Sequence, residues 1–377
     1  MKNIAVAIGD RISPIKGGGA LRVIKTAQAL ARKGHNVTFY APADKQEVEG
    51  MRVENIPVAS QERSMILSSA KMILSLFSKL AKNRNNIDIV FAHNVAAAIP
   101  AIAFCRIFRK KLVYDVTDLQ TEYFLENKKS FAWQQMVKML IRLEYMTYNM
   151  APKLIAVSEA MKERMAESGA KADKIGVVYD GAELKELGMK KEDKEHITVI
   201  HHGGLCPHDG ATLIPQAAKY VLEKHPKTRF CIVGAGAELE KIKALAKQSN
   251  IEHAFEFTGW LPYDKMKEYL RKADIGLVTR TNTKANNTIL TLKLLEYWAS
   301  GTAAVASRLK GMQEISKDEE NIIFFEPENE KSLAEAIVKL ADDRKLLKKL
   351  QKKGNEAVQA FDWEKKAESI AGMILSQ

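Results

Sequence analysis

The sequence predicts an α/β protein built from two parallel sheets, each covered by helices on both faces. Short runs rich in β-branched residues alternate with helical stretches along almost the whole chain, which is typical of parallel sheets. A charged segment without an apolar stripe, residues 183–196, interrupts this alternation once, after which it restarts. A chain of 377 residues is also long enough for two domains. We therefore expect two Rossmann-like domains in tandem.

The first half of the chain begins with a strand-like run at residues 2–8, followed by a glycine-rich loop and a helical stretch that ends at Gly34. Further strands are expected in the runs HNVTFYAP, IDIVFAHN, KLVYDVTD and KLIAVSE. The second half repeats the rhythm with the runs ITVIHHGG, TRFCIVGAG, FEFTGW, DIGLVTR, AAVAS and NIIFFEP. Since open parallel sheets bind ligands at the carboxyl ends of their strands, we expect a ligand site in a cleft between the domains.

The composition is that of a globular protein, with 46% hydrophobic and 28% charged residues. The formal net charge of +12 favours anionic partners such as phosphates, an acidic membrane surface or nucleic acid, although a lysine-rich surface also serves solubility alone. Nothing beyond this charge supports a nucleic-acid role. The three cysteines lie far apart, the N-terminus lacks the features of a signal peptide, and no apolar stretch is long enough to span a bilayer. We therefore expect a cytoplasmic protein.

A series of segments, in the right order, resembles the retaining GT-B glycosyltransferases of family 4. These segments are GGGALRVIKTAQALARKGHNVTFY, LIAVSEAMKERM, KIGVVYDGAEL, IVGAGAELEKIKALA, FEFTGWLPYDKMKEYLRKADIGLV, KLLEYWASGTAAVAS and FDWEKKA. The resemblance implies an N-terminal acceptor-binding domain over residues 1–182, joined by the crossing helix 362–377, and a C-terminal nucleotide-sugar domain over residues 195–361. It implies transfer of a hexosyl group from a UDP- or GDP-linked donor to a glycan, lipid-linked or small-molecule acceptor, with retention of anomeric configuration and without a cofactor.

Lys293 and Glu296 stand three apart in a predicted helix, so their side chains lie on one face of it. A helix N-terminus offers unpaired N–H groups and a positive dipole end, which suit a diphosphate lying against Leu292 and Lys293. A carboxylate one turn further on can accept hydrogen bonds from both hydroxyls of a ribose. A solvated surface ion pair is the alternative. Because the resemblance places this helix at the donor site, we predict a nucleotide clamp.

Five positions depart from the family pattern, one of them Asp180, where an asparagine is usual. Thr288 stands where a glutamate usually contacts the donor sugar, Gly204 and Asp209 stand where two cations usually hold the diphosphate, and Thr117 replaces a histidine near the reacting sugar. Without those cations the charge on the leaving diphosphate needs other groups to stabilise it. The groups expected to do so are His208, Arg280 and Lys284, with Thr288 offering a hydroxyl to the sugar.

In the first domain, Asp118 is the preferred candidate for a base or a sugar ligand, and Asp115 is the second. Both lie in the run KLVYDVTD, close to Thr117, where the resemblance places the reacting sugar. An aspartate at a strand end is also a common loop residue without a catalytic role, so this alternative stays open.

Glycines mark two further places where backbone N–H groups can approach a phosphate or a base. Gly17, Gly18 and Gly19 precede the first helix, and Gly234 and Gly236 follow a strand of the second domain. The second pair lacks a full dinucleotide-binding fingerprint. We expect both loops to lie at the donor or acceptor site.

A metal site is the less favoured interpretation of the cluster His201, His202, Cys206 and His208. These residue types are good zinc ligands, but their spacing matches no familiar module. Adjacent residues at a strand end also point to opposite faces of the sheet. We therefore predict that no metal is bound.

Residues 63–84 predict a basic amphipathic helix, with five basic residues and no acidic one. Such a helix is typical of peripheral contact with a membrane, here its inner face. A helix packed on the first sheet with a solvated basic face explains the pattern equally well.

Two other functions stay open. A nucleotide-sugar 2-epimerase of the same fold would need acid and base groups on both faces of the sugar, and the sequence shows no clear set. A non-catalytic or partner-dependent relative that binds nucleotide-sugar or glycan would account for Thr117, Gly204, Asp209 and Thr288.

Overall fold

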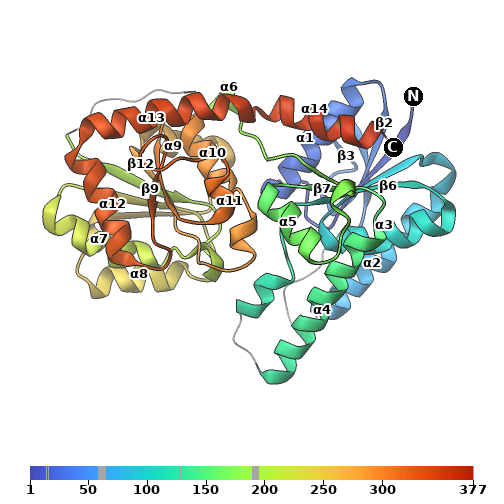
Figure 1. The fold of residues 1–377 in the computed structure, drawn as a ribbon, viewed down its shortest axis with the longest axis horizontal. Coiled ribbons are helices and arrows are strands. Elements are labelled where there is room, and N and C mark those ends of the chain that lie inside the picture. Colours follow the sequence, from blue (N-terminus) through green and yellow to red (C-terminus); the bar gives the residue numbers. More distant parts are fainter. Residues whose placement is uncertain (14, 16, 58–64, 127–129, 189–194, 377) are drawn as a thin grey trace. The chain divides into compact units, whose positions relative to one another are not determined.

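A computed structural model of the protein describes all residues except 14, 16, 58–64, 127–129, 189–194 and 377. The chain divides into two compact units (Figure 1). Unit 1 comprises Met1–Asp180 and Trp363–Gln377, and unit 2 comprises Gly181–Asp362. Each unit has its own sheet, helices and core, which confirms the predicted α/β class with two Rossmann-like domains.

Unit 1 contains an eight-stranded sheet in the order β3-β4-β2-β1-β5-β6-β7-β8. Its strands are β1 (Asn3–Ile8), β2 (Asn36–Ala41), β3 (Glu47–Val48), β4 (Met51–Asn55), β5 (Ile89–His93), β6 (Lys111–Val116), β7 (Leu154–Ala156) and β8 (Ile175–Val177). All neighbouring strands are parallel except β3 and β4, which form an antiparallel edge. This edge was not predicted from the sequence, and its two-residue strand β3 is too short to carry a periodic signal.

The helices of unit 1 are α1 (Gly18–Arg32), α2 (Met65–Lys82), α3 (Asn94–Phe108), α4 (Phe131–Met150), α5 (Glu159–Glu167) and α14 (Trp363–Leu375). Helix α14 packs beside α1 (Figure 1), and its buried Ala367, Ile370 and Ile374 join the core of this unit. Gly34 ends the first helical segment with φ +79°, a backbone conformation that glycine adopts without steric cost.

Unit 2 contains a parallel six-stranded sheet in the order β11-β10-β9-β12-β13-β14. Its strands are β9 (Thr198–His202), β10 (Arg229–Val233), β11 (Phe255–Gly259), β12 (Ile275–Val278), β13 (Ala303–Ser307) and β14 (Ile323–Phe325). Strand β13, AAVAS, is buried along its whole length, as expected for a central parallel strand covered on both faces.

The helices of unit 2 are α6 (Leu184–Leu187), α7 (Leu213–Lys224), α8 (Leu239–Gln248), α9 (Tyr263–Lys272), α10 (Leu292–Ala299), α11 (Lys310–Gln313), α12 (Glu330–Asp342) and α13 (Arg344–Val358). The segment 183–196, expected as a linker, lies partly outside the described residues. Its described beginning forms α6, which is held to α9 by an ion pair between Glu186 and Lys267 at 2.6 Å. This beginning therefore belongs to unit 2.

Among the described residues, no helix combines the length and the apolar character needed to cross a membrane. Helix α2 buries Met72, Leu76 and Leu80 within unit 1 and exposes Leu67 and Leu74. Part of its apolar surface thus packs inside the unit, as the second interpretation of this helix required, while two leucines face solvent.

Candidate functional site

In unit 2, the predicted donor residues gather at the carboxyl ends of neighbouring strands β9 and β12. The loop after β9 carries Asp209, the loop after β12 carries Arg280, and the first turn of α10 carries Lys293. The first turn of α10 follows Thr291, whose side chain makes no capping hydrogen bond. We call Asp209, Arg280, Lys293 and Glu296 the α10 cluster.

Lys293 is buried and bound to an acid. Its Nζ donates to Asp209 Oδ1 at 2.7 Å, and an Arg280 guanidinium nitrogen lies 3.8 Å from the same oxygen. The lysine side chain passes directly over Gly203, where a Cβ would lie 2.9 Å from Lys293 Cε. Gly203 also has φ +108°, so both its conformation and its missing side chain make room for the lysine.

Asp209 therefore acts as the counter-ion of the two cations. Burial raises the pKa of this carboxyl, but Lys293 and Arg280 outweigh burial and hold the pKa below its ordinary value. Asp209 is ionised at neutral pH, and the three groups together carry one net positive charge. The partner of Lys293 is thus an acid 84 residues away in the chain, which the sequence did not reveal.

His208 does not supply the positive charge predicted for it. Burial, together with nearby Arg280 and Lys293, lowers the pKa of His208 to about 4, so its imidazole is neutral at pH 7. The pKa of His201 is likewise lowered to about 3, chiefly by burial. His208, which is partly exposed, can exchange hydrogen bonds with a ligand, but neither histidine adds a cation to the site.

Glu296 lies one turn further along α10, with 9% of its surface exposed. Its Oε2 is 3.4 Å from His202 Nε2. Burial raises the pKa of Glu296 to about 7, although the Tyr263 hydroxyl and Lys293 act in the opposite direction. His202 cannot neutralise this carboxylate, since burial lowers the pKa of His202 well below its ordinary value. Glu296 is therefore a buried acceptor without a cation in direct contact among the described residues.

The loop before α10 is stabilised by its own amides and hydroxyls. Asn286 is fully buried; it accepts from Arg280 at 2.7 Å and donates to the backbone oxygens of His208 and Thr281, each at 2.9 Å. Thr288, expected to face the sugar, donates to Ala285 O at 2.7 Å. Lys284 lies on the same loop with its side chain exposed. Arg280 is thus the loop cation that the structure brings into the α10 cluster, and Lys284 is not.

Gly234 and Gly236 are required by packing between two loops. A Cβ at Gly234 would lie 1.9 Å from Gly203 O, and one at Gly236 would lie 2.4 Å from Leu205 O. Backbone hydrogen bonds join the same loops, from Gly203 N to Val233 O and from Leu205 N to Ala235 O. These glycines hold the loop after β10 against the loop that leads to Asp209, a role that the sequence did not reveal.

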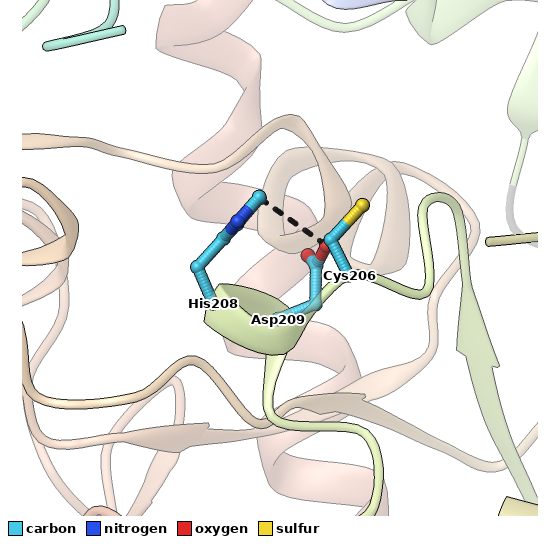
Figure 2. Close-up of side chains that lie close together, drawn as sticks. All are labelled: Cys206, His208 and Asp209. Atoms are coloured by element: carbon cyan, nitrogen blue, oxygen red, sulfur yellow. Dashed lines mark ion pairs between the residues drawn. The ribbon is translucent and has the colours of Figure 1, made fainter. Parts of the chain in front are cut away.

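Cys206, His208 and Asp209 place one potential metal ligand each within 4.8 Å of one another (Figure 2). His208 Nε2 lies 3.6 Å from Asp209 Oδ2. A divalent cation fits this group poorly, because Lys293 and Arg280 already contact the carboxylate and would repel it. Burial and Asp209 also raise the pKa of the Cys206 thiol, which disfavours the thiolate that binds metal. The expectation that no metal is bound stays a prediction.

In unit 1, a buried ionic network lies at the carboxyl ends of β5 and β6. Arg22 of α1 is fully buried and donates to both oxygens of Asp115, at 2.8 and 2.9 Å, and to Asp180 at 2.9 Å. Asp115 also accepts from His93 Nδ1 at 2.7 Å. Arg22 and His93 hold the pKa of Asp115 down at about 2 despite burial. Asp115 is therefore a structural anion, not a free base.

His93 occupies the place next to Thr117. The other ring nitrogen, His93 Nε2, lies 3.4 Å from Thr117 Oγ1 and 3.3 Å from Asn94 Nδ2. Asn94 begins α3 with φ +58° and accepts from the Thr117 backbone N–H at 3.1 Å. Arg22, His93 and Asn94 were not among the site residues predicted from the sequence. The polar pair His-Asn at the end of a predicted strand was the available signal.

Asp118 is half-buried beside this network, with Asp10 and Asp180 as its electrostatic neighbours. Gly17 is the N-cap of α1, and Gly18 and Gly19 form its first turn. A Cβ at Gly19 would lie 2.7 Å from His93 Nε2, so the glycine lets the helix N-terminus approach the imidazole. Of the three predicted glycines, Gly19 thus lies against the network around His93.

Two family models match consecutive parts of the chain. The model described as Glycosyltransferase Family 4 matches residues 16–186, and the model described as Glycosyl transferases group 1 matches residues 185–357. An uncharacterised glycosyltransferase of Methanocaldococcus jannaschii is 22% identical, covering 90% of this chain and 89% of the relative. The D-inositol 3-phosphate glycosyltransferase of Corynebacterium glutamicum is 20% identical, covering 95% and 91%.

Solved structures show the same fold. Sucrose-phosphate synthase from Thermosynechococcus elongatus aligns with a TM-score of 0.85 at 19% identity, over 100% of this chain and 99% of the other. An Anabaena protein in complex with UDP and glucose aligns with a TM-score of 0.79 at 19% identity, over 100% of both chains. The two family matches and this fold identify the chain as a GT-B glycosyltransferase.

Proposed function

We propose that the protein transfers a hexosyl group from a UDP- or GDP-linked sugar to a hydroxyl of a glycan, lipid-linked or small-molecule acceptor, with retention of anomeric configuration. The observation that carries this proposal is the α10 cluster. Lys293 and Arg280 meet the buried carboxylate of Asp209 at the start of α10, and Glu296 lies one turn further along the helix. The cluster lies at the carboxyl ends of parallel strands, in the unit that matches the group 1 family model.

The cluster divides the work of binding a nucleotide. The first turn of α10 at Leu292, together with Lys293 and Arg280, would take the diphosphate, and Glu296 would accept hydrogen bonds from the ribose hydroxyls. As the bond between the anomeric carbon and the diphosphate oxygen breaks, negative charge grows on the leaving group. Lys293 and Arg280 would stabilise that charge, which lowers the barrier to departure.

The acceptor hydroxyl forms the new bond to the anomeric carbon on the same face of the sugar as the bond that breaks, and its proton passes to the Asp118 carboxylate. Asp118 is the proposed site residue for this hydroxyl, because Asp115 is already engaged by Arg22 and His93. His208 and Thr288 would contribute hydrogen bonds to the donor, with no charge. Gly17, Gly18 and Gly19 would offer backbone N–H groups to the acceptor side. No cofactor is proposed, since the two cations can take the role of a metal.

A non-catalytic relative is the second candidate, and the Lys293–Asp209 contact at 2.7 Å favours it. Asp209 already pairs with the cations that a transferase would use to stabilise the leaving diphosphate, so a nucleotide must compete with it. This arrangement is compatible with a protein that binds a nucleotide but no longer catalyses transfer. The nucleotide-sugar 2-epimerase has no such support. Location at the inner face of a membrane through residues 63–84 also stays a proposal; residues 58–64 lie outside the described part of the chain.

The test combines binding with turnover. Thermal unfolding is followed with UDP, GDP, ADP and their sugar conjugates, using the wild type, Glu296→Gln and the matched control Glu252→Gln on an exposed turn of the same unit. A ligand that binds only the folded state raises the midpoint. We expect one nucleotide to stabilise the wild type and the control, and to stabilise Glu296→Gln less.

Turnover then separates the candidate functions. Release of nucleoside diphosphate with acceptor-dependent product of retained configuration supports transfer. Binding without release supports the non-catalytic relative, and conversion of free donor into its epimer supports the epimerase. No binding of any nucleotide would reject the assignment of the α10 cluster.

A further inference from the structure

Exposed apolar side chains are concentrated on one part of unit 1. Of the fourteen large hydrophobic residues exposed in the described part of the chain, ten lie between Leu67 and Met150. Four of them, Met139, Leu143, Met146 and Met150, follow one another along α4 at spacings of four, three and four residues. This spacing places them on a single face of the helix. A stripe of that kind belongs to a contact surface rather than to scattered exposure.

The stripe continues onto α3, which packs between α2 and α4 in the same unit (Figure 1). Ile99 and Ile107 of α3 are exposed, and Arg106 donates to Met150 O at 3.4 Å, joining the ends of the two helices. We define the α3–α4 face by its exposed residues Ile99, Arg106, Ile107, Arg109, Lys138, Met139, Arg142, Leu143, Met146 and Met150.

The charge around this face has one sign. Helices α2, α3 and α4 carry six basic residues and one acidic residue, Glu144, which is 1% exposed. Lys138 and Arg142 flank the apolar stripe of α4 on one side. Arg106 and Arg109 lie at the C-terminal end of α3, where Arg106 contacts Met150 of the stripe. An exposed apolar stripe bordered by cations is the pattern of a surface that enters the interface of an anionic bilayer.

We propose that the α3–α4 face binds the surface of an anionic lipid bilayer. The apolar stripe enters the boundary between head groups and acyl chains, and the flanking arginines and lysines contact lipid phosphates. The stripe from Met139 to Met150 is about 16 Å long at the rise of an α-helix. Its length allows several side chains to enter the same leaflet with the helix lying flat.

The charge pattern argues against a second copy of the chain as the occupant. A two-fold interface through this face would bring Lys138 and Arg142 of each copy near the same cations of the other, without an exposed acid on these helices to compensate. An anionic bilayer supplies the missing negative charge. The proposal goes beyond residues 63–84, because it places the main contact on α4 and α3.

The test measures binding of the full chain to phosphatidylcholine vesicles with and without phosphatidylglycerol, by co-sedimentation. One variant, Met139→Gln/Leu143→Gln/Met146→Gln, removes the apolar stripe, and a second, Lys138→Gln/Arg142→Gln, removes two flanking cations. The matched control, Lys345→Gln/Lys352→Gln, removes two cations from α13, a basic helix with no exposed large hydrophobic residue in its described length. All substituted residues are exposed, and circular dichroism checks that each variant is folded.

We expect the wild type and the α13 control to bind vesicles that contain phosphatidylglycerol and to bind phosphatidylcholine alone weakly. Each cation near an anionic surface changes partitioning roughly fivefold, so Lys138→Gln/Arg142→Gln should bind about 30-fold more weakly. The apolar variant should lose binding by at least about tenfold, even at low salt. Equal binding by all variants, or a loss confined to the α13 control, would overturn the proposal. So would a dimer of the wild type that the apolar variant abolishes, if neither protein binds vesicles.

Discussion

Among single residues, Asp209 has the largest influence on how the cations of the α10 cluster are used. Its Oδ1 lies 2.7 Å from Lys293 Nζ and so occupies the position in which a diphosphate oxygen would pair with the lysine. Replacing one partner of a buried ion pair leaves the other uncompensated and costs about 3 kcal/mol or more. We expect Asp209→Asn to lower the melting temperature of the ligand-free protein.

The same variant should respond more strongly to nucleotide. A diphosphate would now contact Lys293 and Arg280 without competition, so the rise in melting temperature with the preferred nucleoside diphosphate should exceed that of the wild type. The measurement is a titration followed by differential scanning fluorimetry. A rise equal to that of the wild type would mean that Lys293 and Arg280 do not contact the phosphates.

Glu296 makes nucleotide binding dependent on pH. Its carboxylate must be ionised to accept from two ribose hydroxyls, and burial raises its pKa to about 7. Affinity should therefore rise as pH increases toward 8, by up to about tenfold per unit below pH 7. Calorimetric titration of the wild type and Glu296→Gln at several pH values tests this. The nucleotide's own phosphate ionisation affects both proteins, so identical pH profiles would exclude Glu296 from the ribose site.

Residue roles were the part of the site least accessible from sequence. The spacing of Lys293 and Glu296 predicted their shared helix, but the partner of Lys293 lies 84 residues away on another loop. His93 and Thr117, 24 residues apart, meet only because β5 and β6 pair in parallel. Local patterns carry no information on such contacts, and a charge predicted from residue type alone ignores burial, as His208 illustrates.

On the scale of elements, the loops after β9 and β10 are positioned by glycine. A Cβ at Gly234 would overlap Gly203 O, and Gly234 has φ +152°. We expect Gly234→Ala to destabilise the protein by about 1–3 kcal/mol and to disturb the loop that carries Asp209. Gly259→Ala is the matched control, because Gly259 has φ +68° and open space around it. Urea denaturation compares them; equal losses would mean that the close approach at Gly234 adds nothing to the cost of its backbone conformation.

The elements themselves were largely predictable, since buried parallel strands are continuous apolar runs and their helices have a clear period. The expected strands at residues 2–8 and in AAVAS correspond to β1 and β13. Helix α2 shows the limit of periodicity. The sequence marks an apolar stripe, but only the packed structure shows that Met72 and Leu76 are buried while Leu67 and Leu74 are exposed.

For the whole molecule, the two separate cores predict two unfolding transitions, each with its own buried acid. Glu144 lies in unit 1 and Glu296 in unit 2, and burial raises the pKa of each to about 7 from an ordinary value of 4.5. Each folded unit therefore holds a proton that the unfolded chain releases above about pH 4.5. Each contribution to stability is fully present below that pH and is lost as pH rises through 7, amounting to about 3 kcal/mol.

Scanning calorimetry of the full chain at several pH values between about 5 and 8, a range that includes the raised pKa values, tests this prediction. The unit 1 transition should move to lower temperature as pH rises. In unit 2 the buried neutral histidines His201, His202 and His208 act in the opposite direction below about pH 6.5, so the contribution of Glu296 is the difference between the wild type and Glu296→Gln. Glu144→Gln should remove part of the shift from one transition only, since glutamine can still accept from Thr121. Glu296→Gln should act on the other transition, which the preferred nucleotide should also raise in the wild type. If either variant moved both transitions equally, or a single transition responded to every change, the two units would not unfold independently.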